Sequence, residues 1–383
     1  MRTIYLDHNA TTPLDPDVRA SMLPFLAEVF GNPSSIHAEG RRARAFLDEA
    51  REKLAAIWGC KPSELVFTSG GTEANNLAIL SAARTRRDRG RHLITSMIEH
   101  HAVLRPMQYL AASEGFTVTI VGTDPYGFVD PSEIARTLRQ DTILVSIMAA
   151  NNEVGTIQPV TEIGRLCRDR GVLFHTDAVQ WFGKRPLRKI TEFEADLVTC
   201  CAHKLYGPKG AGCLYVRSPL RLQSALFGGS QEDERRPGTE NLAGIVGLVA
   251  AVARFANPPV FDPPRLRSLT ERLEALTTAL PGVRRWGAPV ADRLANTLAL
   301  TAEHCDSLSL LAGLDLAGVC ASSGSACSVG SLTSSHVLTS LGASPEQAAG
   351  LVRFSLGRNT TLEDIEAAAT IFAAVVNHVR NPT

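Results

Sequence analysis

The chain has 383 residues, and its 39 lysines and arginines balance its 39 aspartates and glutamates, so the formal net charge is zero. This balance argues against a nucleic-acid-binding surface as the main function. The apolar content of 44% is ordinary for a globular protein and excludes a disordered chain. A chain of this length is expected to form about two domains.

Targeting signals and disulfides are not expected. The first ten residues, MRTIYLDHNA, carry Asp7 and His8 where a signal peptide needs an apolar core. The longest apolar run, 242–253, is too short to span a bilayer. Eight cysteines in a chain of this length, without a secretory signal, do not indicate a disulfide framework. None of them forms a C-x-x-C pair, so a structural zinc site is not expected either. We therefore expect a reduced, cytoplasmic protein that binds no metal, membrane or nucleic acid.

The first two thirds of the chain alternate between strands and helices. Residues 1–14 are predicted to form an extended arm, and 15–30 a helix with Pro16 in its first turn. Ser34 or Ser35 is expected to cap a long helix that ends at Trp58. Predicted strands then lie at 65–68, 92–95, 116–121, 142–147, 172–175, 195–199 and 212–216, and predicted helices at 100–113, 131–138, 160–170 and 241–255, with one more starting at 74. This rhythm predicts an α/β fold with a mainly parallel sheet and helices on both faces.

A proline-rich linker, 256–264, separates this part from a second, smaller α/β domain. In that domain the pattern predicts a helix at 265–280, a strand at 296–300 and a helix at 307–313. A loop of small residues, 321–335, and two closing helices complete it. We expect a large domain of residues 15–256, and a small domain of residues 1–14 and 257–383.

Chemically useful residues follow several of the predicted strands. Ligands of parallel α/β sheets bind outside the carboxyl ends of the strands. Five separate strand ends carry such residues, and together they predict one site: Gly71 with Thr72, His100, Asn151, Asp177 and Lys204.

Two of these strand ends suggest a cofactor with a phosphate. The turn SGGTE at 69–73 leaves free N–H groups at the start of a helix, and such groups can bind an anion. The alternative is a capped connection between strand and helix that binds no ligand. The turn lacks the GK[ST] ending of a nucleotide-binding loop, so a smaller phosphorylated cofactor fits better. Lys204 follows a strand, beside His203 and a glycine turn, where a desolvated amine can form a Schiff base. The alternative is a solvated lysine in a surface loop.

Asp177 completes this interpretation. A buried carboxylate needs a cationic partner, and a protonated pyridine nitrogen is one, as in pyridoxal phosphate enzymes. The alternative is a helix cap. With pyridoxal 5'-phosphate as cofactor, the expected roles are a phosphate contact for Gly71, Thr72 and His203, stacking on the ring for His100, and a hydrogen bond to the ring hydroxyl for Asn151 and Gln180.

Cys327 stands apart from the other cysteines. Its surroundings, SSGSACSVGS at 322–331, are small and flexible and offer no apolar face to bury a thiol. Most cysteines pack as small hydrophobic residues, whereas a loop thiol is accessible enough to react.

Taken together and in their order along the chain, the motifs of this sequence resemble those of the NifS/IscS-type cysteine desulfurases. These are class V members of the fold-type I pyridoxal phosphate enzymes. The resemblance runs almost from end to end. The segments that carry it are YLDHNATTP (5–13), GNPSS (31–35), FTSGGTEANN (67–76), EHHAV (99–103), ILVSIMAANNEVGTIQP (143–159), HTDAVQ (175–180), HKLYGPKG (203–210), RRPGTEN (235–241), SSGSACS (322–328) and VRFSLGR (352–358).

The resemblance implies a fold, a reaction and roles for single residues. It implies a seven-stranded sheet, a homodimer in which Thr239 reaches the phosphate of the partner subunit, and a sulfur-acceptor protein such as an iron–sulfur scaffold. Lys204 carries the cofactor and removes the Cα proton of L-cysteine, and His100 is a further candidate for proton transfer. Arg353 grips the substrate carboxylate, with Asn151 beside it. Cys327 attacks the substrate sulfur, which leaves a persulfide on Cys327 and releases alanine.

One residue departs from the family pattern, and three other functions remain open. Where relatives often carry a serine or threonine as a phosphate ligand, this chain has Cys201, which we expect to contact the phosphate, although a thiol is a weaker donor. A selenocysteine lyase and a class V aminotransferase are the nearest alternatives, although an aminotransferase needs no loop cysteine. A non-catalytic scaffold would have no reason to keep Lys204, Asp177, His100 and Cys327 together.

Overall fold

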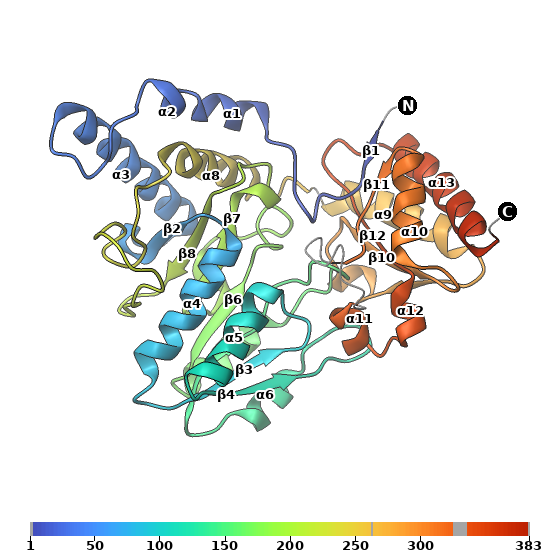
Figure 1. The fold of residues 1–383 in the computed structure, drawn as a ribbon, viewed down its shortest axis with the longest axis horizontal. Coiled ribbons are helices and arrows are strands. Elements are labelled where there is room, and N and C mark those ends of the chain that lie inside the picture. The colour runs from blue at the N-terminus through green and yellow to red at the C-terminus, as the bar shows by residue number, and fades with distance from the viewer. Residues whose placement is uncertain (1–2, 262, 325–334, 382–383) are drawn as a thin grey trace.

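The computed structural model describes residues 3–261, 263–324 and 335–381, and its centre is a seven-stranded sheet (Figure 1). Every neighbouring pair of strands in this sheet is parallel except the two pairs that involve β8. The predicted mainly parallel, seven-stranded α/β fold is therefore confirmed. The strands lie in the order β2 (Leu65–Thr68), β8 (Gly212–Val216), β7 (Leu197–Cys201), β6 (Leu173–Asp177), β5 (Thr142–Ser146), β3 (His92–Ser96) and β4 (Thr117–Val121).

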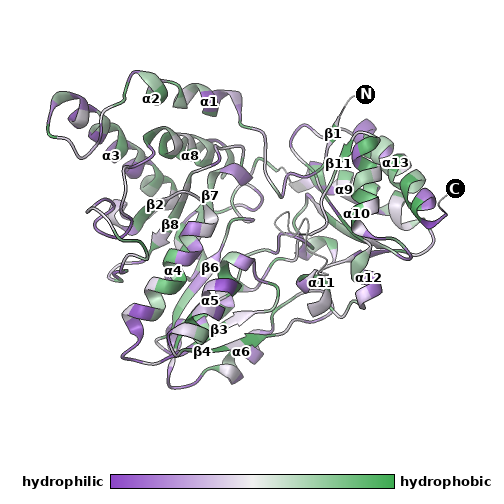
Figure 2. Ribbon diagram, in the orientation of Figure 1, coloured by the Kyte–Doolittle hydropathy of each residue, from purple (hydrophilic) through white to green (hydrophobic). Residues whose placement is uncertain are grey.

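Helices cover both faces of this sheet because alternate residues along each strand are buried in two different cores. Leu144, Leu173 and Leu197 pack with α4 (Gly71–Arg86) and α5 (His101–Ser113). Their neighbours Val145, Phe174 and Val198 pack on the other side. There they meet α3 (Ala38–Trp58), α7 (Val160–Asp169) and α8 (Leu242–Phe255). Figure 2 shows the hydrophobic residues gathered along these inner strands and helix faces. This period of two is what an α/β sheet buried on both sides requires.

A second body, on the right of Figure 1, is built around a three-stranded antiparallel sheet. Its strands are β12 (Leu351–Ser355), β10 (Thr297–Ala302) and β9 (Val283–Trp286). Its long helices are α9 (Pro263–Thr278), α10 (Ser307–Leu316) and α13 (Leu362–Arg380). The start of the chain belongs here too, because β1 (Ile4–Tyr5) pairs in parallel with β11 (Val319–Cys320). On this pairing we propose that residues 1–14 join 257–383 in one domain and 15–256 form the other.

Several predicted elements differ in the structure. The single helix predicted at 15–30 is wrong: α1 (Pro16–Met22) and α2 (Pro24–Ala27) replace it, since Pro24 has no N–H to continue the helix. His37, and neither Ser34 nor Ser35, caps α3 by accepting from the Gly40 N–H. The sequence also missed β9 and β12, whose arginines break the apolar pattern of a strand.

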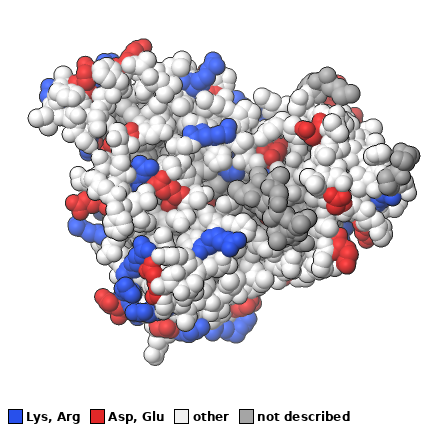
Figure 3. All heavy atoms as spheres, in the orientation of Figure 1, with Lys and Arg blue, Asp and Glu red and all other residues white. Residues whose placement is uncertain are grey.

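The elements not yet described are short. Two of them, α11 (His336–Ser340) and α12 (Pro345–Ala349), precede α13, so three helices follow residue 335 where the sequence predicted two. The others are α6 (Pro131–Thr137) and the 3-10 turns η1 (Pro62–Glu64), η2 (Ile190–Phe193), η3 (Ala202–Lys204) and η4 (Val290–Asp292). Among the described helices, none combines the length and apolarity needed to cross a membrane. On the face drawn in Figure 3, side chains of both charges are interspersed.

One close backbone contact ties the sheet to the turn before α4. Gly212 in β8 pairs with Thr68 and Cys201, and a Cβ atom built on it would lie 2.7 Å from the Cα of Gly70. We predict that Gly212→Ala lowers the free energy of unfolding by about 1–3 kcal/mol, because the added methyl forces this backbone apart. Urea unfolding measures the change.

Gly122→Ala is the matched control, since a Cβ there meets no atom within 4 Å. It should change the unfolding free energy by no more than about 0.5 kcal/mol. An equal loss in both variants would show that the contact between β8 and Gly70 does not matter for stability.

Candidate active site

A cavity of about 210 Å³ opens at the carboxyl ends of the central strands, where the N-terminal arm and β12 meet them. It brings together residues from five separate strand ends, as the sequence predicts. Its lining consists of Asn9, Ala10, Gly71, Thr72, Asn75, His100, Met148, Ala150, Asn152, Asp177, Val179, Gln180, Cys201, His203, Lys204 and Arg353.

Lys204 enters the cavity from η3, directly after β7. Its Nζ donates hydrogen bonds to the main-chain oxygens of Asn9 and Ala10, both at 2.6 Å. Burial is the main cause that lowers the pKa of Lys204 below its usual value. An amine shielded from water loses its proton more easily than a solvated one, and this effect outweighs the two carbonyl oxygens, which favour the protonated form. Lys204 therefore has the character of a nucleophile.

Asp177 is the last residue of β6 and is 6% exposed. One carboxylate oxygen accepts from the Val179 N–H at 3.0 Å, and the other accepts from Asn75 Nδ2 at 2.6 Å. A local capping role, the alternative to a ligand contact, thus accounts for only one oxygen. No ion pair joins Asp177 to a Lys, Arg or His within the described ranges, so the carboxylate suits a cationic ligand atom.

The first turn of α4 offers backbone donors to the cavity. Gly70 precedes the helix with φ 156° and ψ −175°, a conformation that only glycine adopts readily, and no side chain caps the helix there. The first N–H groups of a helix have no intrahelical acceptor, so those of Gly71 and Thr72 can bind an anion, and the Gly71 N–H also interacts with the Cys201 thiol. The sequence predicted the helix to start at Ala74, but it starts at Gly71.

Two histidines beside Lys204 are held neutral. His100 precedes α5, and its Nδ1 accepts from the Ala102 N–H at 3.1 Å, which leaves the ring proton on Nε2. Burial is the main cause that lowers the pKa of His100. Burial, with Lys204 and Lys209 nearby, lowers the pKa of His203 to about 4.

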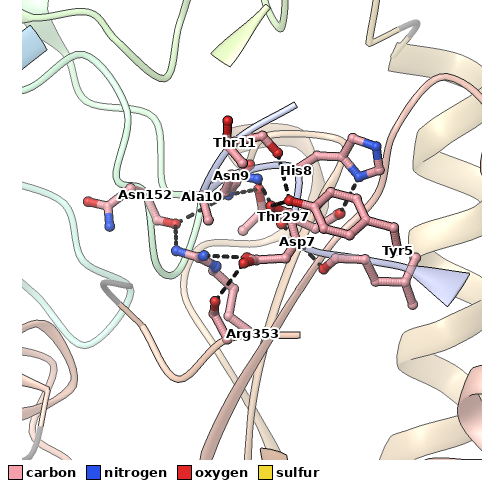
Figure 4. Close-up of polar contacts among 12 residues, drawn as sticks. Tyr5, Asp7, His8, Asn9, Ala10, Thr11, Asn152, Thr297 and Arg353 are labelled. Carbon is pink, nitrogen blue, oxygen red and sulfur yellow. Dashed lines mark hydrogen bonds and ion pairs between the residues drawn. The ribbon is translucent and has the colours of Figure 1, made fainter. Parts of the chain in front are cut away.

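Arg353 projects from β12 into the cavity and is 1% exposed (Figure 4). Its guanidinium donates to Asp7 at 2.7 Å and to the main-chain oxygen of Asn152 at 3.0 Å. Asp7 also accepts from Ser322 Oγ at 2.8 Å. The Arg353 Nε atom has no partner in the described structure. The Asp7 carboxylate therefore fixes the guanidinium in place, and the remaining N–H groups of Arg353 can bind a second carboxylate.

The assignment of Asn151 to this site is corrected by the structure. The Asn151 side chain is fully buried and turned away, since Nδ2 donates to the Ile98 oxygen and Oδ1 accepts from the N–H groups of Glu153 and Val154. Asn152 lines the cavity instead. Adjacent asparagines read alike in a sequence, and only the turn decides which one faces the site.

The other predicted residues have different positions. Gln180 and Cys201 line the cavity, and burial is the main cause that raises the pKa of the Cys201 thiol to about 11. Thr239 is exposed and does not line this cavity. Cys327 lies outside the described residues. Sequence reasoning missed Asp7, Asn9 and Asn75, which have no local signal because their partners lie far along the chain.

The cavity fits pyridoxal 5'-phosphate. It offers a buried lysine amine for the aldehyde, a carboxylate without a cation for the ring nitrogen, and free helix N–H groups for the phosphate. The buried Asn75 Oδ1 atom also has no partner in the described structure. The lysine, the carboxylate and the start of α4 all line the same cavity, so a single ligand can contact all three.

Known proteins share this architecture. The family described as aminotransferase class-V matches residues 4–368. A cysteine desulfurase IscS of Dictyoglomus turgidum is 44% identical over 99% of this chain and 96% of its own length. A putative cysteine desulfurase IscS 1 of Bacillus subtilis is also 44% identical, over 99% of this chain and all (100%) of its own.

Solved structures agree. A NifS-like protein superposes with a TM-score of 0.91 at 36% identity, over 98% of this chain and 99% of its own. SspA in complex with cysteine superposes with a TM-score of 0.81 at 35% identity, over 94% of this chain and 100% of its own.

The two neighbouring asparagines give a direct test of the cavity. We predict that Asn151→Ala lowers the free energy of unfolding by about 2–4 kcal/mol, because three buried backbone groups lose their partner. Asn152→Ala should change it by about 0.5 kcal/mol or less, and should weaken cofactor or substrate binding. Urea unfolding and cofactor titration of both variants measure this. The reverse pattern would return Asn151 to the site.

Proposed function

We propose a function from one premise: the chain belongs to the class-V aminotransferase family, and within it to the cysteine desulfurases. The protein is a pyridoxal phosphate-dependent enzyme that converts L-cysteine to L-alanine and transfers the sulfur. The observation that carries this function is the convergence of Lys204, Asp177 and the start of α4 on one cavity. The roles of single residues below are our proposal.

The chain holds the cofactor at three points. Lys204 would hold it covalently, Asp177 would pair with the ring nitrogen, and the N–H groups of Gly71 and Thr72 would bind the phosphate with His203. His100, Gln180 and Asn152 line the same cavity and would contact the ring. When bound, the cofactor supplies an electron sink for the charge that develops at the substrate Cα.

Arg353 and Asp7 orient the substrate. The ion pair with Asp7 fixes the guanidinium, and the donors that remain can bind the substrate carboxylate as a fork. Oriented in this way, the Cα–H bond of the substrate faces Lys204. Pre-set geometry of this kind lowers the entropic part of the barrier.

Lys204 and His100 move the protons. Because burial lowers the pKa of Lys204, its freed amine is able to take the Cα proton at Nζ. The main-chain oxygens of Asn9 and Ala10 accept hydrogen bonds from the ammonium that results. His100 presents Nε2–H, with Nδ1 occupied by the Ala102 N–H, so it can donate a proton to the three-carbon fragment, which keeps the electron pair of the broken Cβ–S bond.

Cys327 is the proposed nucleophile. Its thiolate attacks the substrate sulfur, which leaves a persulfide on Cys327 and a three-carbon fragment that becomes alanine. The chain on either side of 325–334 is attached beside the cavity. Ser322 exchanges backbone hydrogen bonds with Arg353, and Ser335 Oγ donates to Glu153. These attachments support access of this segment to the substrate.

The finer partners are also proposals. An exposed Thr239 supports a homodimer in which this residue reaches the phosphate of the partner subunit. Exposed apolar side chains, among them Leu26, Phe30 and Phe227, supply surface for that contact. We propose an acceptor protein, such as an iron–sulfur scaffold, for the sulfur. The free thiols of the described cysteines suit a cytoplasmic location.

Alanine release from L-cysteine under a reductant tests the function. Wild type should produce alanine, and Cys327→Ala should lose at least about 10²-fold in rate, since the thiolate is the nucleophile. Bound cofactor, measured by its visible absorbance, should be equal in the two proteins. Equal alanine from both would favour a selenocysteine lyase type of reaction that needs no thiol. No alanine from a wild type that holds its cofactor would point to another substrate.

A further inference from the structure

A second buried lysine lies behind the cavity. Lys184 is 1% exposed and belongs to the turn that follows β6, four residues after Gln180. Its Nζ donates to Gln180 Oε1 and to Asn9 Oδ1, and lies 5.3 Å from the centre of the Phe261 ring. No carboxylate forms an ion pair with it in the described part of the chain. A buried lysine without an anion needs an explanation.

Lys184 decides how the Gln180 amide is turned. A lysine amine offers donors to these two amides, so each must direct its oxygen, and not its nitrogen, at Nζ. With its oxygen held by Lys184, Gln180 donates one Nε2 hydrogen to the main-chain oxygen of Asn9 at 3.1 Å. The second Nε2 hydrogen has no acceptor in the described structure, and Gln180 lines the cavity.

The Asn9 amide is held without help from Lys184. Its Oδ1 also accepts from Asn296 Nδ2 at 3.1 Å. Its Nδ2 donates to Thr297 Oγ1 at 2.9 Å and to the main-chain oxygen of Asn152 at 3.2 Å. Gln180 Oε1 has no second donor in the described structure, and the one other contact of this amide is the Nε2 hydrogen bond to the Asn9 oxygen. Its orientation therefore depends on Lys184 more than that of Asn9 does.

We propose that Lys184 is a positioning residue that fixes the Gln180 amide so that its nitrogen faces the cofactor's ring oxygen. This inference rests on the proposed function, because it needs the pyridoxal ring in the cavity. A fixed N–H donor stabilises negative charge on that oxygen. It thereby lowers the proton affinity of the neighbouring nitrogen of Lys204.

Either protonation state of Lys184 can make both contacts, but only the ammonium, which has no acceptor, forbids the opposite orientation of the amides. Burial, with Lys204 and Arg353 nearby, lowers its pKa well below the usual value. A neutral amine still has two N–H groups, one for each amide oxygen. The ammonium has a third, which the face of the Phe261 ring can accept.

The test is a double-mutant cycle of wild type, Lys184→Met, Gln180→Ala and the double variant. Two quantities are measured on each: the dissociation constant of the apoprotein for pyridoxal phosphate, and the pH midpoint of the visible absorbance of the bound cofactor. Lys184→Met should weaken binding about tenfold, as expected for one hydrogen bond to a charged group. It should also raise the absorbance midpoint by about half to one pH unit, because the donor to the ring oxygen is no longer fixed.

The charged and titratable groups around Lys204 are Asp7, His100, Asp177, Cys201, His203 and Arg353, which stay unchanged in all four proteins, and Lys184 itself. Loss of the Lys184 charge alone would raise the midpoint to the same extent with or without Gln180, whereas loss of the fixed donor raises it only while Gln180 is present. Gln180→Ala should shift the midpoint upward by a similar amount. The double variant should then match Gln180→Ala within about twofold in affinity, since Lys184 acts through Gln180.

Arg293→Met is the matched control. Arg293 is also a buried cation, but it pairs with Glu274 away from the cavity. This variant should lose stability and keep the midpoint of wild type. A midpoint unchanged in Lys184→Met, or effects of the two substitutions that add in full, would overturn the proposal. Alanine release by wild type is scored separately, so failure of the proposed function is distinguished from failure of this inference.

Discussion

The structure of the site depends on the contact between the Lys204 amine and two carbonyl oxygens of the N-terminal arm. The arm is held on both sides. Asn9 N–H donates to Ser355 Oγ in β12 at 2.9 Å, and Thr12 N–H donates to the His203 oxygen beside Lys204 at 2.9 Å. The first residues of the chain therefore join β12, which carries Arg353, to η3, which carries Lys204. Figure 4 shows the arm beside Arg353. Carbonyl partners leave the amine able to lose its proton, which a carboxylate partner would oppose.

The same cavity concentrates positive charge. Lys184, Lys204 and Arg353 lie near one another. After burial, Lys204 and Arg353 help to lower the pKa of Lys184, and Arg353 helps to lower the pKa of Lys204. Among the described residues, Asp7 is the anion paired with Arg353, and Asp177 forms no ion pair. The histidines are kept neutral by burial. A surplus of buried donors and cations is costly in an empty site and favourable once a phosphate and a substrate carboxylate enter. The charge of the cavity therefore selects an anionic cofactor and an amino acid.

Sequence reasoning captured the features that local patterns encode. Apolar strands with polar ends predict both the sheet and the meeting of Gly71, His100, Asp177 and Lys204, because parallel strands end at one edge. The break at Pro24 was also readable from the sequence and was missed, since the apolar period continues through it. The choice between Asn151 and Asn152 was not readable, because a one-residue turn geometry decides it. Nor were the partners of Lys184, since Asn9 lies far away along the chain. Cys327, outside the described residues, keeps its role as a proposal.

We propose that Lys204, and not the more deeply buried Lys184, carries the cofactor. Borohydride reduction of the holoenzyme makes the bond between lysine and cofactor permanent, and mass spectrometry of the peptides then locates it. The account predicts the added mass of the reduced cofactor on the peptide that contains Lys204, and none on the peptide that contains Lys184. Label on Lys184, or a holoenzyme whose cofactor is released intact after reduction, would contradict it.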